Sequence, residues 1–237
     1  MTVRLSIEGG VATITLDRPE ARNALNLQMC EELRAAAMAA TADGSVKIVF
    51  VRGSGPVFCA GADVKERSGM SAEQVRARRM KGFAAYEALE ALPMPSIAVV
   101  QGAALGSGAE IAAACDFILA TPDAVFGTPE AQRGTVGATQ RLPRVLGKRL
   151  AKDLMFTGRR LTAEEARLAG LVSRISGDPD EEVEKIAQAI LGAPAEAMRI
   201  AKHCIDRGVE LDPRGALELE LAAIEQQLAS GKWMGKA

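Results

Sequence analysis

Strand and helix patterns alternate along this chain from Val3 to Ile175, and only helical patterns follow. Short runs of β-branched and aliphatic residues end at small-residue turns, and segments with helical spacing come after several of them. Such alternation is typical of folds in which helices cover a sheet. The sequence therefore predicts an α/β core with a helical C-terminal extension, divided here as residues 1–192 and 193–237.

The expected elements can be given approximate bounds. Gly9-Gly10 joins two alternating runs, which predicts a β-hairpin, and Asn26 can cap the helix after it. Strands are expected at 3–8, 11–16, 46–51, 96–100, 116–120, 124–126 and 171–175. Helices are expected at 27–41, at 71–92, from 108 to about 115, at 162–170 behind a capping box, and from 178 onward with breaks at 192–194 and 212–213.

Composition excludes several classes of protein. The net charge of −1 argues against a nucleic-acid binder, which usually carries a strong basic excess. No apolar run approaches the roughly 20 residues that span a bilayer, so no membrane association is expected. The strand pattern begins at Val3 and leaves no room for a signal peptide.

Cysteine and histidine are too sparse for a metal or disulfide framework. The four cysteines, Cys30, Cys59, Cys115 and Cys204, are far apart and form no C-x-x-C unit, and there is one histidine. We therefore expect no metal site and a reduced, cytoplasmic protein.

Two small-residue turns can each present free backbone N–H groups. The segments 58–63 and 102–108 follow strand patterns, and the second opens a helix. Two such turns could direct one N–H each at a single oxygen and form an oxyanion hole. The alternative for 102–108 is an ordinary strand–helix connection. It matches neither G-x-G-x-x-G nor a P-loop, so no nucleotide fingerprint is present.

Glu110 and Glu130 each lie just after a small-residue turn. If the turns meet in space, these residues form a carboxylate pair beside the exposed N–H groups. Each glutamate alone is better explained as an acid in the first turn of a helix, with Thr128 as N-cap and Pro129 at the first position before Glu130, and it is the pairing with two glycine turns that favours the functional interpretation.

His203 and the arginine-rich stretch 76–81 are each explained more simply by a structural role than by a functional one. His203 lies in a helical run and has no G-x-S-x-G elbow to serve, so a structural role is expected. The arginine-rich stretch 76–81 is expected to be a solvated helix face, with contact to a phosphate-bearing ligand as the alternative.

In six blocks of residues, which include both small-residue turns and both glutamates, the chain closely resembles the enoyl-CoA hydratase/isomerase (crotonase) family. The matching blocks are 17–26 (DRPEARNALN), 58–65 (FCAGADVK), 101–110 (QGAALGSGAE), 126–130 (FGTPE), 139–143 (TQRLP) and 166–172 (ARLAGLV). The resemblance implies a crotonase-like spiral of ββα turns with a C-terminal helical module that forms trimers, and acyl-CoA thioesters as substrates.

The resemblance also implies roles for individual residues. The oxyanion hole would be the backbone N–H groups of Ala62 and Ser107, where many members have glycine in place of Ser107. The remaining implied contacts to the acyl-CoA substrate are Arg22, Ala24, Ala60, Asp63, Val64 and Gly106. Coenzyme A would be part of the substrate, and no other cofactor is implied.

Glu110 and Glu130 match positions that are both glutamate in the family's hydratases. The implied reaction is syn addition of water to a 2,3-enoyl-CoA thioester, giving a 3-hydroxyacyl-CoA. Glu130 would be acid/base at the α-carbon, and Glu110 would take the water's proton. Alternatives are isomerisation, C–C bond chemistry, or acyl-CoA binding without turnover. The implied assembly is a homotrimer or a dimer of trimers.

One stretch departs from the family pattern. After Glu130, the segment 134–142 is three residues shorter than the glycine-rich stretch that hydratases usually carry. A shifted helix start or a larger acyl pocket is expected there.

Overall fold

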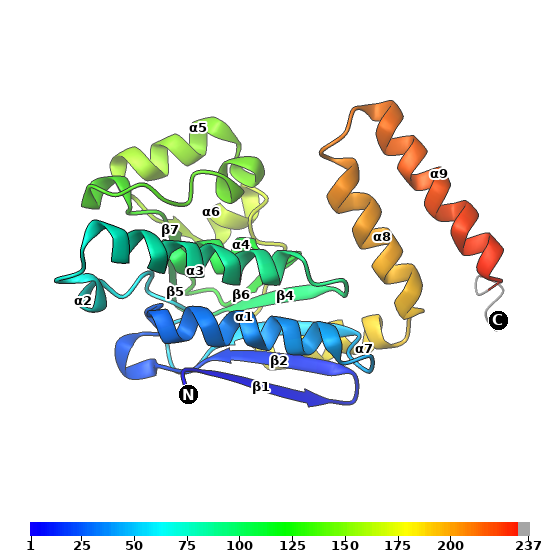
Figure 1. The fold of residues 1–237 in the computed structure, drawn as a ribbon, viewed down its shortest axis with the longest axis horizontal. Helices are drawn as coiled ribbons and strands as arrows, with labels where there is room; N and C mark the ends of the chain where they lie inside the picture. The colour runs from blue at the N-terminus through cyan, green and yellow to red at the C-terminus, as the bar shows by residue number, and fades with distance from the viewer. Residues whose placement is uncertain (232–237) are drawn as a thin grey trace.

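The computed structural model describes residues 1–231 and is built around a six-stranded sheet (Figure 1). The last six residues of the predicted C-terminal part lie outside the described residues. The strand order is β1 (Val3–Glu8), β2 (Val11–Leu16), β3 (Ile48–Gly53), β4 (Ser96–Val100), β6 (Phe117–Ala120) and β9 (Arg174–Ile175). The β1–β2 hairpin is antiparallel, as predicted, and the other neighbours in this sheet are parallel.

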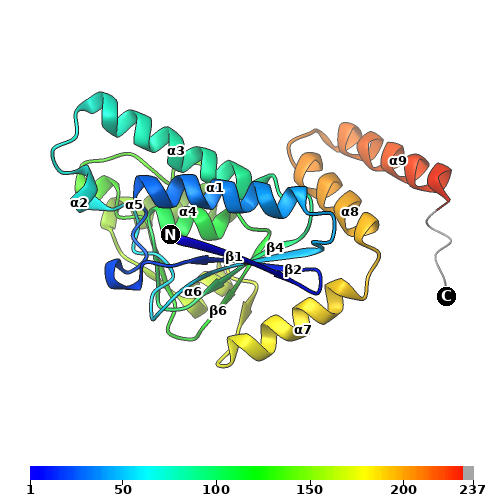
Figure 2. The same cartoon turned by 60° about the horizontal axis from the view of Figure 1, so that its bottom comes forward.

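Helices cover both faces of the sheet (Figure 2). α1 (Leu27–Ala42), α3 (Ala72–Glu90) and α4 (Ser107–Ala113) lie on one face, and α7 (Pro179–Leu191) lies on the other. Strand β3 is buried on both sides because its alternate residues enter two separate cores. Val49 and Val51 belong to the large core, whereas Ile48 and Phe50 pack in a smaller cluster with Ile186 of α7.

A second, smaller sheet positions the turns between strands and helices. It has the order β5 (Ala103–Leu105), β7 (Val125–Gly127) and β8 (Leu161–Thr162). Isolated parallel bridges between Cys59 and Ala104 and between Leu25 and Ala62 extend this layer. The segments that follow strands of the main sheet therefore lie side by side in the second layer.

The remaining core elements are short, apart from α5. They are η1 (Pro19–Ala21), α2 (Val64–Arg67), η2 (Ala131–Arg133), α5 (Arg141–Thr157) and α6 (Ala163–Leu168). No helix in the described part of the chain is both long and apolar enough to cross a membrane.

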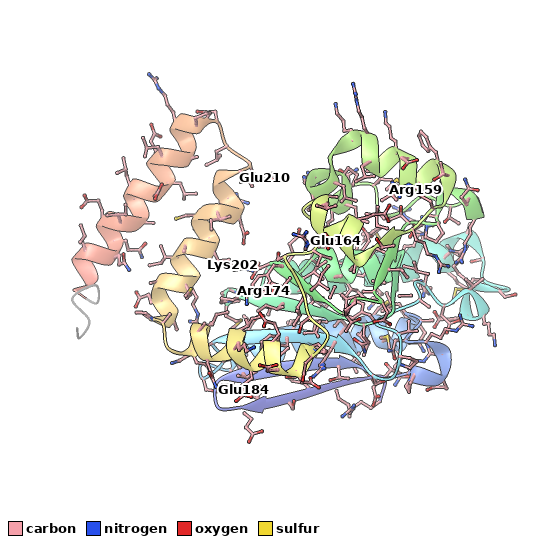
Figure 3. The ribbon with its side chains drawn as sticks, turned by 180° about the vertical axis from the view of Figure 1, so that it is seen from behind. Arg159, Glu164, Arg174, Glu184, Lys202 and Glu210 are labelled. Atoms are coloured by element: carbon pink, nitrogen blue, oxygen red, sulfur yellow. The ribbon has the colours of Figure 1, made fainter. Side chains whose placement is uncertain are left out.

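Two C-terminal helices stand away from the sheet (Figure 1). α8 (Ala195–Gly208) and α9 (Pro213–Ser230) pack against each other, and no described residue of either is buried. An ion pair between Lys202 of α8 and Asp116 at the start of β6 joins the pair to the core; Lys202 is labelled in Figure 3.

Most predicted bounds are confirmed, and the caps are formed as expected. Asn26 caps α1 and Thr162 forms a capping box for α6; Ser71 forms a further capping box for α3, which was not predicted. The predicted strand at 171–175 is wrong in length, because only Arg174–Ile175 pairs with β6. The short elements α2 and β5 are not evident in the sequence pattern, since four and three residues show no periodicity.

The predicted helix start at Thr128 is also wrong. Glu130, not Thr128, is the N-cap of the 3₁₀ helix η2, and its side chain makes no capping hydrogen bond. The Thr128 hydroxyl is buried without a hydrogen-bond partner among the described residues. Glu130 is therefore not held in place by a capping role.

Candidate active site

The two small-residue turns meet, as the sequence suggested. Cys59 donates its N–H to the carbonyl of Ala103 and accepts the N–H of Leu105, both at 3.0 Å. A Cβ on Gly108 would lie 2.3 Å from the Cys59 carbonyl oxygen, so only glycine allows this approach. The start of α4 is thereby fixed against the segment 58–63.

Each turn leaves one backbone N–H without a partner. Leu25 donates to the Gly61 carbonyl at 2.8 Å and accepts the Asp63 N–H at 2.9 Å. In such a parallel bridge the intervening residue, Ala62, directs its own N–H away from Leu25. Neither the Ala62 N–H nor the Ser107 N–H donates a hydrogen bond to any residue in the range 1–231. These two donors are available to an oxygen of a ligand.

The Ser107 side chain is engaged elsewhere. Its hydroxyl lies close to the hydroxyl of Tyr86, the chain's one tyrosine, which is buried on α3. Burial raises the pKa of Tyr86, so its hydroxyl stays neutral. Serine at this position therefore keeps its backbone N–H free while its side chain contacts α3.

Glu130 lies directly against the turn before α4. A Cβ on Gly106 would lie 2.5 Å from Oε1 of Glu130, and one on Gly137 would lie 3.0 Å from its Cγ. The other carboxylate oxygen, Oε2, is buried and has no hydrogen-bond partner among the described residues. A buried carboxylate oxygen without a partner is unfavourable and calls for a functional explanation.

Glu110 lies one turn into α4 and is 5% exposed. Burial raises its pKa, the guanidinium of Arg141 opposes that rise, and the like charge of Glu130 adds to it. The backbone N–H of Ala138, in the shortened stretch, also opposes the rise of this pKa. The two glutamates therefore lie within electrostatic range of each other.

Burial likewise raises the pKa of Glu130, while its own backbone N–H and the cations Arg133 and Arg79 oppose the rise. Arg79 also donates to the Val136 carbonyl at 2.9 Å, which ties the shortened stretch to α3. Both carboxyls are thus biased toward holding a proton.

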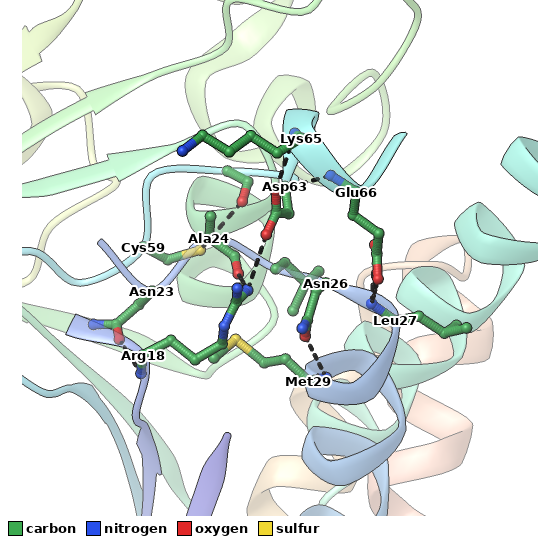
Figure 4. A network of polar contacts seen from close by, with 12 residues as sticks. Arg18, Asn23, Ala24, Asn26, Leu27, Met29, Cys59, Asp63, Lys65 and Glu66 are labelled. Atoms are coloured by element: carbon green, nitrogen blue, oxygen red, sulfur yellow. Dashed lines mark hydrogen bonds and ion pairs between the residues drawn. The ribbon is translucent and has the colours of Figure 1, made fainter. Parts of the chain in front are cut away.

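Apart from Gly106, the residues implied to contact the acyl-CoA substrate lie on two adjacent segments, 22–25 and 60–64; Ala24 and Asp63 are labelled in Figure 4. Ala60 donates its N–H to the Arg22 carbonyl at 3.0 Å, which places 22–25 beside 60–63. The Asp63 side chain caps α2 and accepts from Arg18 at 3.1 Å. Val64, the first residue of α2, is 58% exposed. The two segments therefore lie side by side, and Ala24, Ala60 and Asp63 on them are half-buried.

Sequence reasoning missed the polar side chains that hold these segments. Asn23 is buried at positive φ, accepts the Arg18 N–H and donates to the carbonyls of Ser54 and Val57. Arg18 in turn donates to the Ala24 carbonyl at 2.7 Å (Figure 4). An asparagine tolerated at positive φ is the one signal that could have indicated this turn.

The expectation that 76–81 is a solvated helix face is wrong at Arg78. This side chain is buried, pairs with Glu66 at 2.6 Å and donates to the Leu25 carbonyl. Glu66 also accepts the Leu27 N–H at 2.8 Å. Arg78 therefore holds the start of α1 and the segment before Ala62 together.

The remaining hollows do not compete with this site. A groove of about 490 Å³ on the outer face of β1–β3 contains Arg4 and Arg52, each paired with an aspartate, and none of the predicted site residues. Within residues 1–231, no three His, Cys, Asp or Glu side chains are grouped as metal ligands.

This chain is similar in sequence to several known proteins. The family model described as enoyl-CoA hydratase/isomerase matches residues 6–233. The crotonyl-CoA hydratase of Syntrophomonas wolfei is 38% identical over 226 residues, covering 92% of this chain and 86% of that protein. The human mitochondrial enoyl-CoA hydratase domain-containing protein 2 is 41% identical over 223 residues, covering 89% and 76%.

Solved structures agree. An enoyl-CoA hydratase from Bacillus anthracis has a TM-score of 0.91 at 36% identity and covers 95% of this chain and 90% of its own. One from Geobacillus kaustophilus has a TM-score of 0.91 at 32% identity, covering 98% and 92%. The predicted crotonase-like α/β fold is confirmed, and this chain belongs to the enoyl-CoA hydratase/isomerase family.

Proposed function

We propose that this protein is an enoyl-CoA hydratase, which adds water in the syn sense to a 2,3-enoyl-CoA thioester. One observation carries the proposal. The buried Glu110 and the half-buried Glu130, whose Oε2 is buried without a hydrogen-bond partner among the described residues, lie beside two free backbone N–H groups on adjoining turns. Double-bond isomerisation needs one acid/base group, whereas the addition of water has a use for two.

The N–H groups of Ala62 and Ser107 would hold the thioester oxygen. As the enolate forms, negative charge develops on that oxygen, and both donors stabilise it. The segments 22–25 and 60–64 would hold coenzyme A, chiefly through backbone groups. Coenzyme A then enters and leaves as part of the substrate, and the proposal needs no separate cofactor.

The carboxyl pair would divide the proton transfers. Ionised Glu110 takes a proton from water, the water oxygen bonds to the β-carbon, and protonated Glu130 gives a proton to the α-carbon. The pair thus begins and ends with one proton, because Glu130 loses its proton to the α-carbon and Glu110 gains one from water. Two nearby carboxyls favour a single shared proton because like charges repel, and burial raises the pKa of both.

The shortened stretch after Glu130 still lies beside both glutamates. The Ala138 N–H opposes the rise in the pKa of Glu110, and a Cβ on Gly137 would lie 3.0 Å from Cγ of Glu130. The stretch therefore stays next to both carboxyls despite its shortening, which supports hydration.

The assembly would be a homotrimer or a dimer of trimers. The apolar side chains Ile205, Val209, Leu217, Leu221, Ile224 and Leu228 on α8 and α9 are 42% to 79% exposed. Apolar faces of this size usually meet a partner, which supports self-association through the C-terminal helices.

Absorbance of the conjugated thioester tests the reaction. With crotonyl-CoA and longer or aromatic 2-enoyl-CoAs, hydration removes the band. A gain of absorbance from 3-enoyl-CoA would instead indicate isomerisation, and binding with neither change would indicate a member without turnover. Either result would overturn the proposed hydration.

A further inference from the structure

The side chain of Glu130 lies between two glycines that come from different segments. A Cβ on Gly106 would lie 2.5 Å from Oε1 of Glu130, and one on Gly137 would lie 3.0 Å from its Cγ and 3.6 Å from Oε1. The side chain is thus confined from both sides. Its direction therefore depends on where the backbone of each glycine lies.

The two glycines are held very differently. Gly106 lies at the N-terminus of α4, and its N–H donates at 2.8 Å to the carbonyl of Gly127, the last residue of β7. Gly137 belongs to the shortened stretch and lies in neither a helix nor a strand. The position of Gly137 consequently requires contacts from outside the stretch.

Hydrogen bonds within the stretch do not provide these contacts. Thr135 donates its N–H and its hydroxyl to the Glu130 carbonyl, at 2.9 and 3.2 Å, which folds the chain back but fixes only the main chain of Glu130. Ala138, the residue after Gly137, is buried at a φ of 54°. An alanine keeps such a conformation only where surrounding contacts impose it.

Helix α3 supplies contacts at both ends of the stretch. Arg79 donates from Nη1 to the Val136 carbonyl at 2.9 Å. At the other end, Arg141 pairs with Glu90 at 2.6 Å, and its guanidinium carbon lies 5.7 Å from the centre of the Tyr86 ring. Arg79, Tyr86 and Glu90 share one face of α3, because their separations in sequence are close to whole helical turns. The stretch is therefore fixed to a single helix face at both of its ends.

We propose that Arg79 is a positioning residue for Glu130. By holding the Val136 carbonyl it fixes the next residue, Gly137, against the Glu130 side chain, and so keeps the carboxylate beside Gly106. The inference rests on the proposed function, in which Glu130 gives a proton to the α-carbon. Arg79 acts through main-chain atoms and does not itself touch the acyl group in this role.

Crystal structures of the wild type and of Arg79→Met test the position of Glu130 without turnover. Methionine keeps an extended side chain and removes the donor to Val136. We expect residues 136 and 137 to move away from α3, and the Glu130 carboxylate to leave Gly106 or to occupy two positions. A Glu130 side chain that stays in place would overturn the proposal. Arg76→Met, at an exposed position three residues earlier on α3, is the control and should leave Glu130 unmoved.

Gly137→Ala changes the same contact without altering α3, so it provides a second variant if Arg79→Met does not fold. Its added Cβ should displace the Glu130 carboxylate as well. An unmoved carboxylate in Gly137→Ala would show that Gly137 does not confine Glu130 and would equally overturn the proposal.

Hydration of crotonyl-CoA gives the functional readout. The kcat of Arg79→Met should fall about 10-fold, since small displacements of reacting groups have effects of this order, whereas KM should stay close to that of the wild type. The loss should be the same at every pH, and Arg79→Lys, which restores a donor, should recover most of kcat. A loss confined to one limb of the pH profile would instead assign the effect to the charge of Arg79 and contradict the proposal.

The Glu130→Gln background separates positioning from a general structural role. Arg79→Met should reduce kcat no further in this background, because the group that it displaces is already absent. An equal loss in both backgrounds would overturn the proposal. If the wild type hydrates no enoyl-CoA, the proposed function fails, and the crystal structures still decide whether Arg79 positions Glu130.

Discussion

Gly106 and Glu130 are in contact across the candidate active site, 24 residues apart in sequence: a Cβ on Gly106 would lie 2.5 Å from Oε1 of Glu130. The missing side chain lets the carboxylate reach the turn that carries the Ser107 N–H. The glycine at this position is therefore part of the site rather than only a flexible joint.

Replacing Gly106 with alanine should displace the Glu130 carboxylate. We expect hydration of crotonyl-CoA to fall about 10²-fold, since misplacement by about 1 Å has this effect in other active sites. The control is Gly134→Ala, which also has positive φ but no atom within 4 Å of the added Cβ. Equal losses in both variants would mean that backbone strain, not contact with Glu130, is responsible.

Glu110→Gln and Glu130→Gln should each reduce kcat for hydration by about 10²–10⁴, the usual contribution of general acid–base catalysis. The double variant should lose little more than the worse single one, because the two groups act as a unit. Glu87→Gln, on the exposed side of α3, is the control. If the losses of the two single variants added up in the double variant, or if either single variant kept its turnover, the proposal that Glu110 and Glu130 share one proton would be contradicted.

The stability of the protein should depend on the ionisation of Glu110. Burial raises its pKa in the folded state, so the folded protein holds this proton more tightly than the unfolded chain. The resulting stability is fully present below the unfolded pKa, about 4.3 for glutamate, and is lost as pH rises through the folded pKa.

Glu110→Gln cannot ionise and should therefore gain stability relative to wild type as pH rises from 4.5 to 8. Urea unfolding at a fixed protein concentration measures the difference, with Glu87→Gln as reference. A difference that is the same at both ends of this range would contradict the prediction.

Arg78→Met should destabilise the fold by about 3 kcal/mol, because removal of one partner from a buried pair leaves Glu66 uncompensated. Lys81 lies on α3, like Arg78. Lys81→Met breaks the exposed ion pair between Lys81 and Glu31 of α1 and should change the free energy of unfolding by about 0–1 kcal/mol. Urea unfolding of both variants makes the comparison. Similar small effects would show that the Arg78 network does not hold α1 and the segment before Ala62.

Leu221→Glu should disrupt the assembly, because Leu221 lies on the exposed apolar face of α9 and is 51% exposed. Light scattering after size-exclusion chromatography should show a smaller species than wild type. Leu168→Glu makes the same change at a 75% exposed position on α6 and should leave the mass unchanged. A wild-type monomer would refute the predicted trimer.

Local patterns predicted the elements that depend on nearby residues. The hairpin at Gly9-Gly10 and the caps at Asn26 and Thr162 form as expected because their hydrogen bonds join residues close in sequence. The wrong predictions concern segments whose conformation depends on residues remote in sequence. The start of η2 depends on what surrounds Thr128, and the pairing of Arg174–Ile175 depends on β6, which lies far away in the chain.

The sequence by itself determined which groups are available: two glutamates after small-residue turns, glycines at the points of closest approach, and the family blocks that relate them. The tertiary structure decided which of them act on one another. It placed Glu130 against Gly106, brought the Ser107 hydroxyl close to Tyr86, and packed Arg141 over the Tyr86 ring. Residue types and short-range hydrogen bonds can be read along the chain, whereas desolvation and charge–charge interactions depend on distances that arise only when remote segments pack together.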